Sequence, residues 1–246
     1  MINFLSSFTN GIITAGLPII AKSISLLRSL YLWLSSVHGL TSGATLLLAS
    51  SIADLIGARR IEVVGCLLLS VFTLACGLSN TGTQLVIFRA FQAIAMSMHL
   101  PASVALVAAA VPHGKSRNVS FGCLGLSQPL GLSAGLVISG IMIEKAGWRS
   151  GICLSAGATV VASLIGMWSL PKFPQETLVT GGHGVPSIPI RLWTESDWIG
   201  GLIASTGLAL LAYVLALLSA VLSIIHKAST AVLFALSLAL LLSFPL

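Results

Sequence analysis

The sequence predicts an all-α integral membrane protein, and three observations lead to that fold class. Of the 246 residues, 56% are hydrophobic and 7% are charged, and the mean hydropathy is +1.05. A soluble globular protein carries roughly a quarter of its residues as Asp, Glu, Lys or Arg, so this chain cannot coat a surface that faces water. Apolar runs recur along the chain, and each has the length of about 20 residues that crosses a bilayer as a helix. These runs lack the alternation of apolar and polar residues that a membrane β-barrel requires, which leaves helices.

The charge-free runs define about eight spanning helices. The third and fourth are divided by polar residues at 79–84, and the fourth continues past Arg89. Short connections with single or paired bases separate most of the others, as juxtamembrane anchors do. The expected spans are residues 2–21, 29–53, two within 63–111, 119–143, 150–170, 198 to about 225, and 228–246.

One long connection divides the chain into parts. Residues 171–197 hold four prolines and a Gly-Gly-His-Gly cluster, and proline and glycine both disfavour a helix there. We expect residues 1–170 to form a six-span bundle and 171–197 to form a linker, which lies in the cytoplasm if the N-terminus does. Residues 198–246 then add two further spans.

The charged residues and the cysteines exclude several other functions. The net charge is +6, but no run of five bases and no zinc-finger spacing accompanies it, so we expect the lipid bilayer, and not nucleic acid, as the partner. The four cysteines lie inside apolar runs with no histidine at ligand spacing, which predicts packing residues. His38 and His99 are likewise expected to pack. We expect no cofactor, no metal site and no catalytic residues.

Three short stretches carry the candidate functional residues. In the connection after the second span, Asp54 closes one helix, Gly57 permits a tight turn and Arg59 opens the next, so the acid and the base can pair or cap opposing helix ends. A loop with snorkelling bases is the simpler alternative. In the fourth span, Arg89 and Gln92 lie one turn apart, and an intramembrane arginine marks a functional or internally paired site, unless it snorkels to the interface.

The fifth span has a glycine-rich face and a proline. Pro129 is expected to bend the helix, and Gly131, Gly135 and Gly140 favour close approach of a neighbouring helix. Gln128 stands beside the proline. Together with Arg89, it is the best polar candidate within the spans for contact with a substrate.

These stretches together resemble the major facilitator superfamily. Residues 50–60 are similar to its cytoplasmic loop signature, with Asp54, Gly57 and Arg59 matching, and Arg89 and Gln92 match its Arg-x-x-Gln-Gly element. Gly135 and Gly140 match the antiporter element of the fifth span. Further matches at residues 16–18, 147–149 and 197–200 look closest to fungal drug:proton antiporters with fourteen spans, of the aminotriazole-resistance type.

The resemblance implies a transporter, not an enzyme. Its role would be efflux of small drug-like or toxic solutes across a plasma membrane by proton antiport, with the gating residues named above. The sequence departs from that pattern in the first span, where Thr9 occupies the place of an acid, and no other Asp or Glu is expected at mid-membrane. An ion or nutrient facilitator is therefore an alternative.

The family fold also needs a second six-helix bundle, which these 246 residues do not supply. We expect either a truncated gene product or an incomplete version of a longer one. A truncated membrane protein without transport activity is thus a further alternative. The substrate, the coupling ion, the direction of transport and the oligomeric state do not follow from the sequence.

Overall fold

The computed structural model describes residues 1–24, 28–169, 198–220 and 228–243, and every element in these ranges is an α-helix. This confirms the predicted all-α class, and the eight described helices match the predicted number. The helices are α1 (Ile2–Ser23), α2 (Arg28–Ile56), α3 (Ala58–Leu78), α4 (Gly82–Ala110), α5 (Lys115–Ala146), α6 (Trp148–Ser169), α8 (Trp198–Ala220) and α9 (Ala228–Ser243).

Six of the described helices, α1 to α6, are long and apolar enough to cross a membrane. Within α8, the shorter stretch Gly200–Leu215 is apolar, and α9 has 16 residues. The predicted linker 171–197 lies outside the described residues. So do the parts of the last two predicted spans beyond residues 220 and 243.

The helices begin and end where turn-forming residues interrupt the apolar runs. Gly57 stands alone between α2 and α3 with φ of 105°, and Gly147 stands alone between α5 and α6 with φ of 79°. Side chains disfavour such positive φ values, so glycine permits both tight connections. The polar break at 79–84 separates α3 from α4 as predicted, and Thr81 caps α4 by accepting a hydrogen bond from the Gln84 amide at 3.3 Å.

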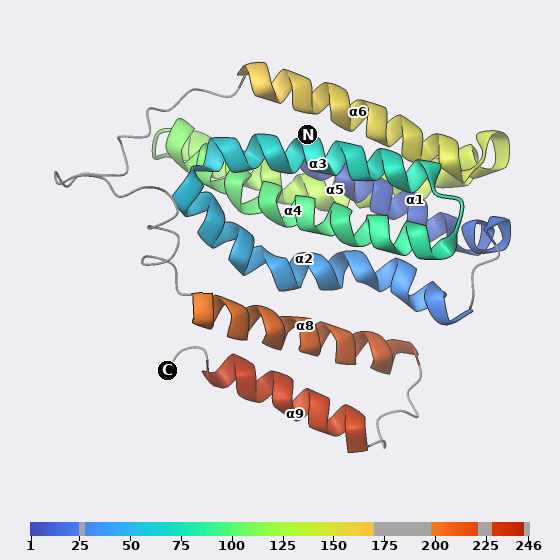
Figure 1. Cartoon of the computed structure of the whole chain (residues 1–246). Coiled ribbons are helices and arrows are strands. Elements are labelled where there is room, and N and C mark those ends of the chain that lie inside the picture. The colour runs from blue at the N-terminus through green and yellow to red at the C-terminus, as the bar shows by residue number, and fades with distance from the viewer. Residues whose placement is uncertain (25–27, 170–197, 221–227, 244–246) are drawn as a thin grey trace.

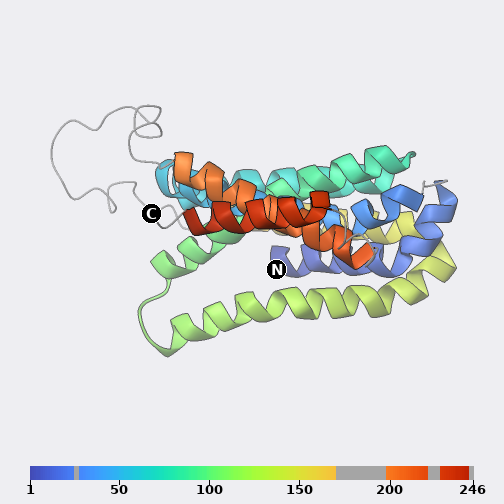
Figure 2. The same cartoon turned by 90° about the horizontal axis from the view of Figure 1, so that it is seen from below.

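The helices lie side by side with their long axes roughly aligned (Figure 1). From α6 at one edge, the order across the view runs through α3 and α4 to α2, and then to α8 and α9 at the other edge. In the turned view, α5 lies along one side of the molecule (Figure 2), where it packs against α1. Helix α8 packs on α2, with the Trp33 and Tyr213 rings 5.8 Å apart, and α9 packs on α8.

An apolar cluster joins the first six helices at their centre. Ile12 of α1 and Leu85 of α4 are fully buried, as is Ile152 of α6. The outward faces of the same helices carry exposed Leu, Ile and Val. This distribution suits a bundle whose outer surface meets lipid.

Candidate functional site

A polar cavity of about 290 Å³ lies among α1, α2, α4 and α5. Serines, glycines and amides make up most of its wall, and no Asp, Glu, Lys or Arg is among the residues that line it. Such a wall offers hydrogen bonds rather than a fixed charge. The lining residues are Ser6, Ser7, Asn10, His38, Gly39, Ser42, Gly43, Leu46, Met96, Ser97, Leu100 and Gln128.

Behind this wall, Arg89 is buried in the centre of the bundle with 2% of its surface exposed. Its Nη1 donates to Asn10 Oδ1 at 2.6 Å and to Gln92 Oε1 at 3.0 Å. Gln92 Nε2 in turn donates to Thr73 Oγ1 at 2.8 Å. This Arg89 network ties α4 to α1 and α3, and because Asn10 also lines the cavity, the network reaches the cavity wall.

The Arg89 charge has no carboxylate partner among the described residues. Neutral amide oxygens solvate it, and its Nε has no hydrogen-bond partner in the described part of the chain. A buried charge is costly unless polar groups surround it. The alternative that Arg89 snorkels to the interface is therefore wrong, because both its burial and its hydrogen bonds point into the bundle.

The predicted loop residues lie at one end of the bundle. Asp54 is exposed in the last turn of α2, and Gly57 makes the turn into α3. Arg59 is half-buried in the first turn of α3. The predicted pairing of Asp54 with Arg59 is not formed, since Asp54 has no ion pair or hydrogen bond to any described residue. At the C-terminus of α2, a carboxylate also faces the unfavourable end of the helix dipole.

Of the predicted residues of α5, two lie in a tight interface with α1. A Cβ at Gly131 would collide with the carbonyl oxygen of Phe4, and one at Gly135 with that of Phe8. On the α1 side, a Cβ at Gly11 would come within 2.6 Å of the Leu132 carbonyl oxygen.

The other predicted residues of α5 are exposed. No described atom would lie within 4 Å of a Cβ at Gly140, so the expected close approach does not extend to this glycine. Pro129 is exposed within the helix, and Gln128 borders the cavity.

Thr9, which takes the place of an acid in the first span, does not border the cavity. It is fully buried, and its Oγ1 donates to Ser155 Oγ of α6 at 2.9 Å. The residue acts as a connection between α1 and α6.

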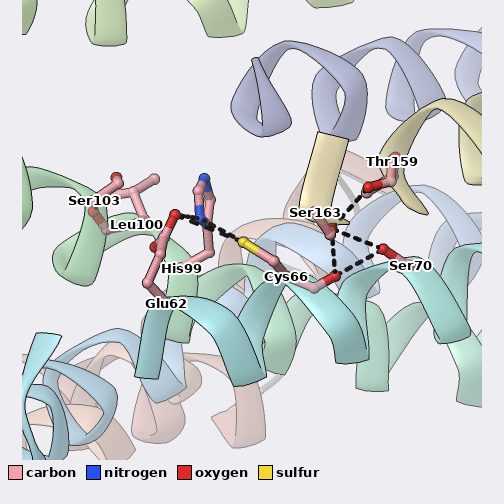
Figure 3. A network of polar contacts seen from close by, with 8 residues as sticks. All are labelled: Glu62, Cys66, Ser70, His99, Leu100, Ser103, Thr159 and Ser163. Carbon is pink, nitrogen blue, oxygen red and sulfur yellow. Dashed lines mark hydrogen bonds and ion pairs between the residues drawn. The ribbon is translucent and has the colours of Figure 1, made fainter. Parts of the chain in front are cut away.

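Sequence reasoning missed one cluster of polar residues between α3 and α4 (Figure 3). Glu62 Oε1 lies 2.8 Å from His99 Nδ1, and Cys66 Sγ lies 3.5 Å from the same nitrogen. The expectation that no cysteine lies near a histidine is thus wrong for Cys66, because helix packing joins residues 33 positions apart. The signal available in the sequence was the i, i+4 spacing of Glu62 and Cys66. Glu62 was overlooked because it follows Arg59 and Arg60 and so resembles the end of a charged loop.

Comparison with known proteins finds relatives of this chain that are named as transporters. The family model of the Major Facilitator Superfamily matches residues 1–246. The chain is 33% identical to "MFS-type transporter 1" of Pyricularia oryzae, over 89% of this chain and 39% of that protein. It is 27% identical to "Riboflavin transporter RibZ" of Clostridioides difficile, over 69% of this chain and 37% of that protein. It is 28% identical to "Multidrug resistance protein Stp" of Mycobacterium tuberculosis, over 56% of this chain and 26% of that protein.

A solved structure shares the fold. It is that of a bacterial homologue of the human lysosomal transporter Spinster, in an inward-facing and unoccupied conformation. The match has a TM-score of 0.50 and 18% identity, and it covers 98% of this chain and 56% of that one. The chain therefore spans only part of the length of each relative that it matches.

Proposed function

The chain belongs to the Major Facilitator Superfamily, and we propose that it serves in the efflux of small drug-like or toxic solutes by proton antiport at a plasma membrane. The cavity beside the Arg89 network carries this proposal. It is concave, it lies open to one side between four helices of the bundle, and hydroxyl and amide groups are among its lining. In transporters of this kind, substrates bind at the interface between two bundles that rock against each other.

The chemistry of the cavity wall bears on the kind of solute. Its lining combines the polar side chains of Ser42, Ser97 and Gln128 with apolar Leu46 and Met96. A wall of this mixed kind suits uncharged or weakly basic compounds with apolar bodies and a few hydrogen-bonding groups. One of the relatives carries the name of a multidrug resistance protein, which agrees with that class.

Conformational coupling is proposed for the loop and glycine residues. Asp54 is exposed and has no described partner, so it is available to a group on a second bundle. Gly57 holds the turn beside it. Gly131 and Gly135 let α5 contact α1 backbone to backbone, a contact that can shift with little rearrangement of side chains.

The proposed division of the chain follows the linker. Residues 1–170 would form the first bundle, 171–197 a cytoplasmic linker and 198–246 two added spans. An immunoblot of the native product with an antibody against residues 171–197 tests this division. A band near twice 25.4 kDa supports a transporter with a second bundle. A band near 25 kDa alone favours a membrane protein without transport activity.

One observation favours a facilitator as the second candidate. No carboxylate lines the cavity, and Thr9 is turned toward α6 instead. Among the residues that line the cavity, only the imidazole of His38 could exchange protons with a solute, and no acid lines the wall beside it.

A cellular efflux assay separates the two candidates. Cells that lack their own drug pumps are loaded with a fluorescent, weakly basic dye, with and without the protein, and then treated with an uncoupler. Proton antiport predicts lower dye accumulation that the uncoupler restores to the level of control cells. A flux that ignores the uncoupler would favour the facilitator, and no difference from control cells would contradict transport.

A further inference from the structure

The cluster of Glu62, Cys66 and His99 has a composition that neither the fold nor the proposed transport requires. Glu62 and Cys66 lie one turn apart on the same face of α3, and His99 meets them from α4 (Figure 3). The Glu62 Oε1 to His99 Nδ1 distance is 2.8 Å, the Cys66 Sγ to Glu62 Oε1 distance 3.6 Å, and the Cys66 Sγ to His99 Nδ1 distance 3.5 Å. Each residue thus turns its potential metal-ligating atom toward the other two.

Two of these three distances fit the ligand spacing of a tetrahedral metal site. Bond lengths of about 2.3 Å to sulfur and about 2.0 Å to nitrogen and oxygen place the sulfur about 3.5 Å from each of the other ligands. The two observed sulfur distances match that spacing. The nitrogen and the oxygen would have to separate by about 0.5 Å to reach their spacing of about 3.3 Å in such a site.

Two polar atoms in the cluster lack a partner. The side chains of His99 and Glu62 are 4% and 9% exposed, and neither His99 Nε2 nor Glu62 Oε2 has a hydrogen bond to a described residue. Buried polar atoms without partners are rare and call for an explanation. A bound cation would give the second carboxylate oxygen a favourable electrostatic environment.

The surrounding helices hold the cluster in place. A Cβ at Gly65 would lie 3.1 Å from the His99 amide nitrogen, so this glycine lets α3 approach α4 at the cluster. The carbonyl oxygen of Cys66 accepts hydrogen bonds from Ser70 Oγ at 2.8 Å and from Ser163 Oγ of α6 at 3.3 Å. The backbone of α3 at the cluster is therefore held against α4 and α6 before any ion binds, which lowers the cost of binding.

We propose that Glu62, Cys66 and His99 bind one divalent transition-metal ion of borderline softness, such as Zn²⁺ or Co²⁺, between α3 and α4. A thiolate, an imidazole nitrogen and a carboxylate oxygen are three ligands that this class accepts, and the fourth position takes water. The site is distinct from the cavity and does not depend on transport activity.

The three side chains supply the ligand forms that such an ion needs. A thiolate from Cys66, a neutral imidazole from His99 and a carboxylate from Glu62 would hold the ion, and binding in these forms is accompanied by release of protons.

Cobalt binding to the purified full chain in lipid nanodiscs tests the proposal, with the metal alone as the probe. After chelator treatment and dialysis, we expect one Co²⁺ per chain and a thiolate-to-cobalt charge-transfer band in the near ultraviolet. Titration calorimetry in buffers of different ionisation enthalpy should show that protons are released as the ion binds. These measurements need no variant, so a failure of a variant to fold cannot obscure them.

Variants then assign the ligands. Cys66→Ser should abolish the charge-transfer band, and His99→Gln and Glu62→Gln should each weaken Co²⁺ binding by at least about 100-fold, since even changes to outer-shell groups cost 10–100-fold. Cys76→Ser is the matched control, because Cys76 is also buried on α3; it should keep both the band and the affinity. Failure of the wild-type chain to bind Co²⁺ would leave only a buried ion pair and overturn the proposal. Binding without the charge-transfer band, or a band that survives in Cys66→Ser, would also overturn it.

Discussion

Two interfaces of the bundle are built on opposite principles. Between α3 and α4, polar side chains meet in the interior: the Arg89 network includes Gln92 and Thr73, and His99 pairs with Glu62. Between α1 and α5, glycines allow direct contact of the two backbones, and the structure gives this pair no side-chain hydrogen bond among the described residues. The α3–α4 interface depends on hydrogen bonds between polar side chains, and the α1–α5 interface depends on the absence of side chains at the glycines.

The difference bears on which parts of the molecule can move. The buried contacts of Gln92 with Thr73 and of His99 with Glu62 are directional, so α3 and α4 should move as one unit. A contact through Gly11, Gly131 and Gly135 has no such directional bonds. We therefore expect α5 to shift against α1 more readily than α3 shifts against α4.

Filling the glycine interface should have the largest effect. In Gly135→Leu, the added side chain would meet the Phe8 backbone, which cannot yield without separating the helices. Overpacking typically costs about 1–3 kcal/mol, and we expect a loss at or above the upper end of that range here. We expect size-exclusion chromatography to show little or no monodisperse protein for this variant, and thermal unfolding to show no cooperative transition. Gly140→Leu, at the exposed glycine of the same helix, is the control and should behave like the wild type. Equal stability of the two variants would refute the close contact.

Removing a partner of Arg89 should have the next largest effect. Gln92→Leu deletes the acceptor at 3.0 Å from Nη1 and the donor to Thr73, which should lower the stability by about 2–3 kcal/mol. Thermal unfolding of the purified variant beside the wild type measures this loss of stability. Gln84→Leu, at an exposed glutamine near the start of α4, should change stability by less than about 1 kcal/mol. A Gln92 variant as stable as the Gln84 variant would show that the network does not fix α4.

A single neutral hydrogen bond should matter less. Thr9→Val keeps the shape of the side chain and removes the bond from α1 to Ser155, at an expected cost of about 1 kcal/mol. Thr14→Val is the control, because Thr14 is exposed and its hydroxyl bonds only within its own helix to the Asn10 carbonyl. Urea unfolding of both variants measures the two losses in unfolding free energy. A larger loss in the Thr14 variant would contradict the role given to Thr9.

The loop acid should affect stability least and transport most selectively. Asp54 is exposed and has no partner in the described ranges, so Asp54→Asn should change the unfolding free energy by no more than about 0.5 kcal/mol. If Asp54 contacts a second bundle, dye efflux by a protein that carries both bundles should still be lower with Asp54→Asn than with the wild-type residue. Glu144→Gln, at another exposed acid, is the control for a general effect of charge. Unchanged efflux in Asp54→Asn would remove the loop from the proposed gate.

The sequence allowed most of the fold to be predicted, because apolar runs of membrane length and their polar breaks are local features. The division of α3 from α4 at residues 79–84 is one example. The burial of Arg89 could be anticipated only as one of two alternatives, since the choice depends on whether neighbouring helices offer Asn10 and Gln92 as acceptors.

The complete cluster around His99 could not be predicted from the sequence for a related reason. Its members come from two helices, and only the packing of α3 on α4 at Gly65 brings them together. Similarly, Gly131, Gly135 and Gly140 look alike in the sequence, but only the first two face α1.

The proposed solute path runs through the cavity beside the Arg89 network, and substitution of Gln128 tests this path most directly. Gln128 borders the cavity but is otherwise exposed, and it has no hydrogen bond to a described residue. The measurement is dye efflux of Gln128→Leu beside its melting temperature, both relative to the wild type. We predict at least a tenfold loss of efflux, about 1.4 kcal/mol in binding terms, with an unchanged melting temperature. Wild-type efflux in this variant would contradict the assignment of the cavity as the solute path.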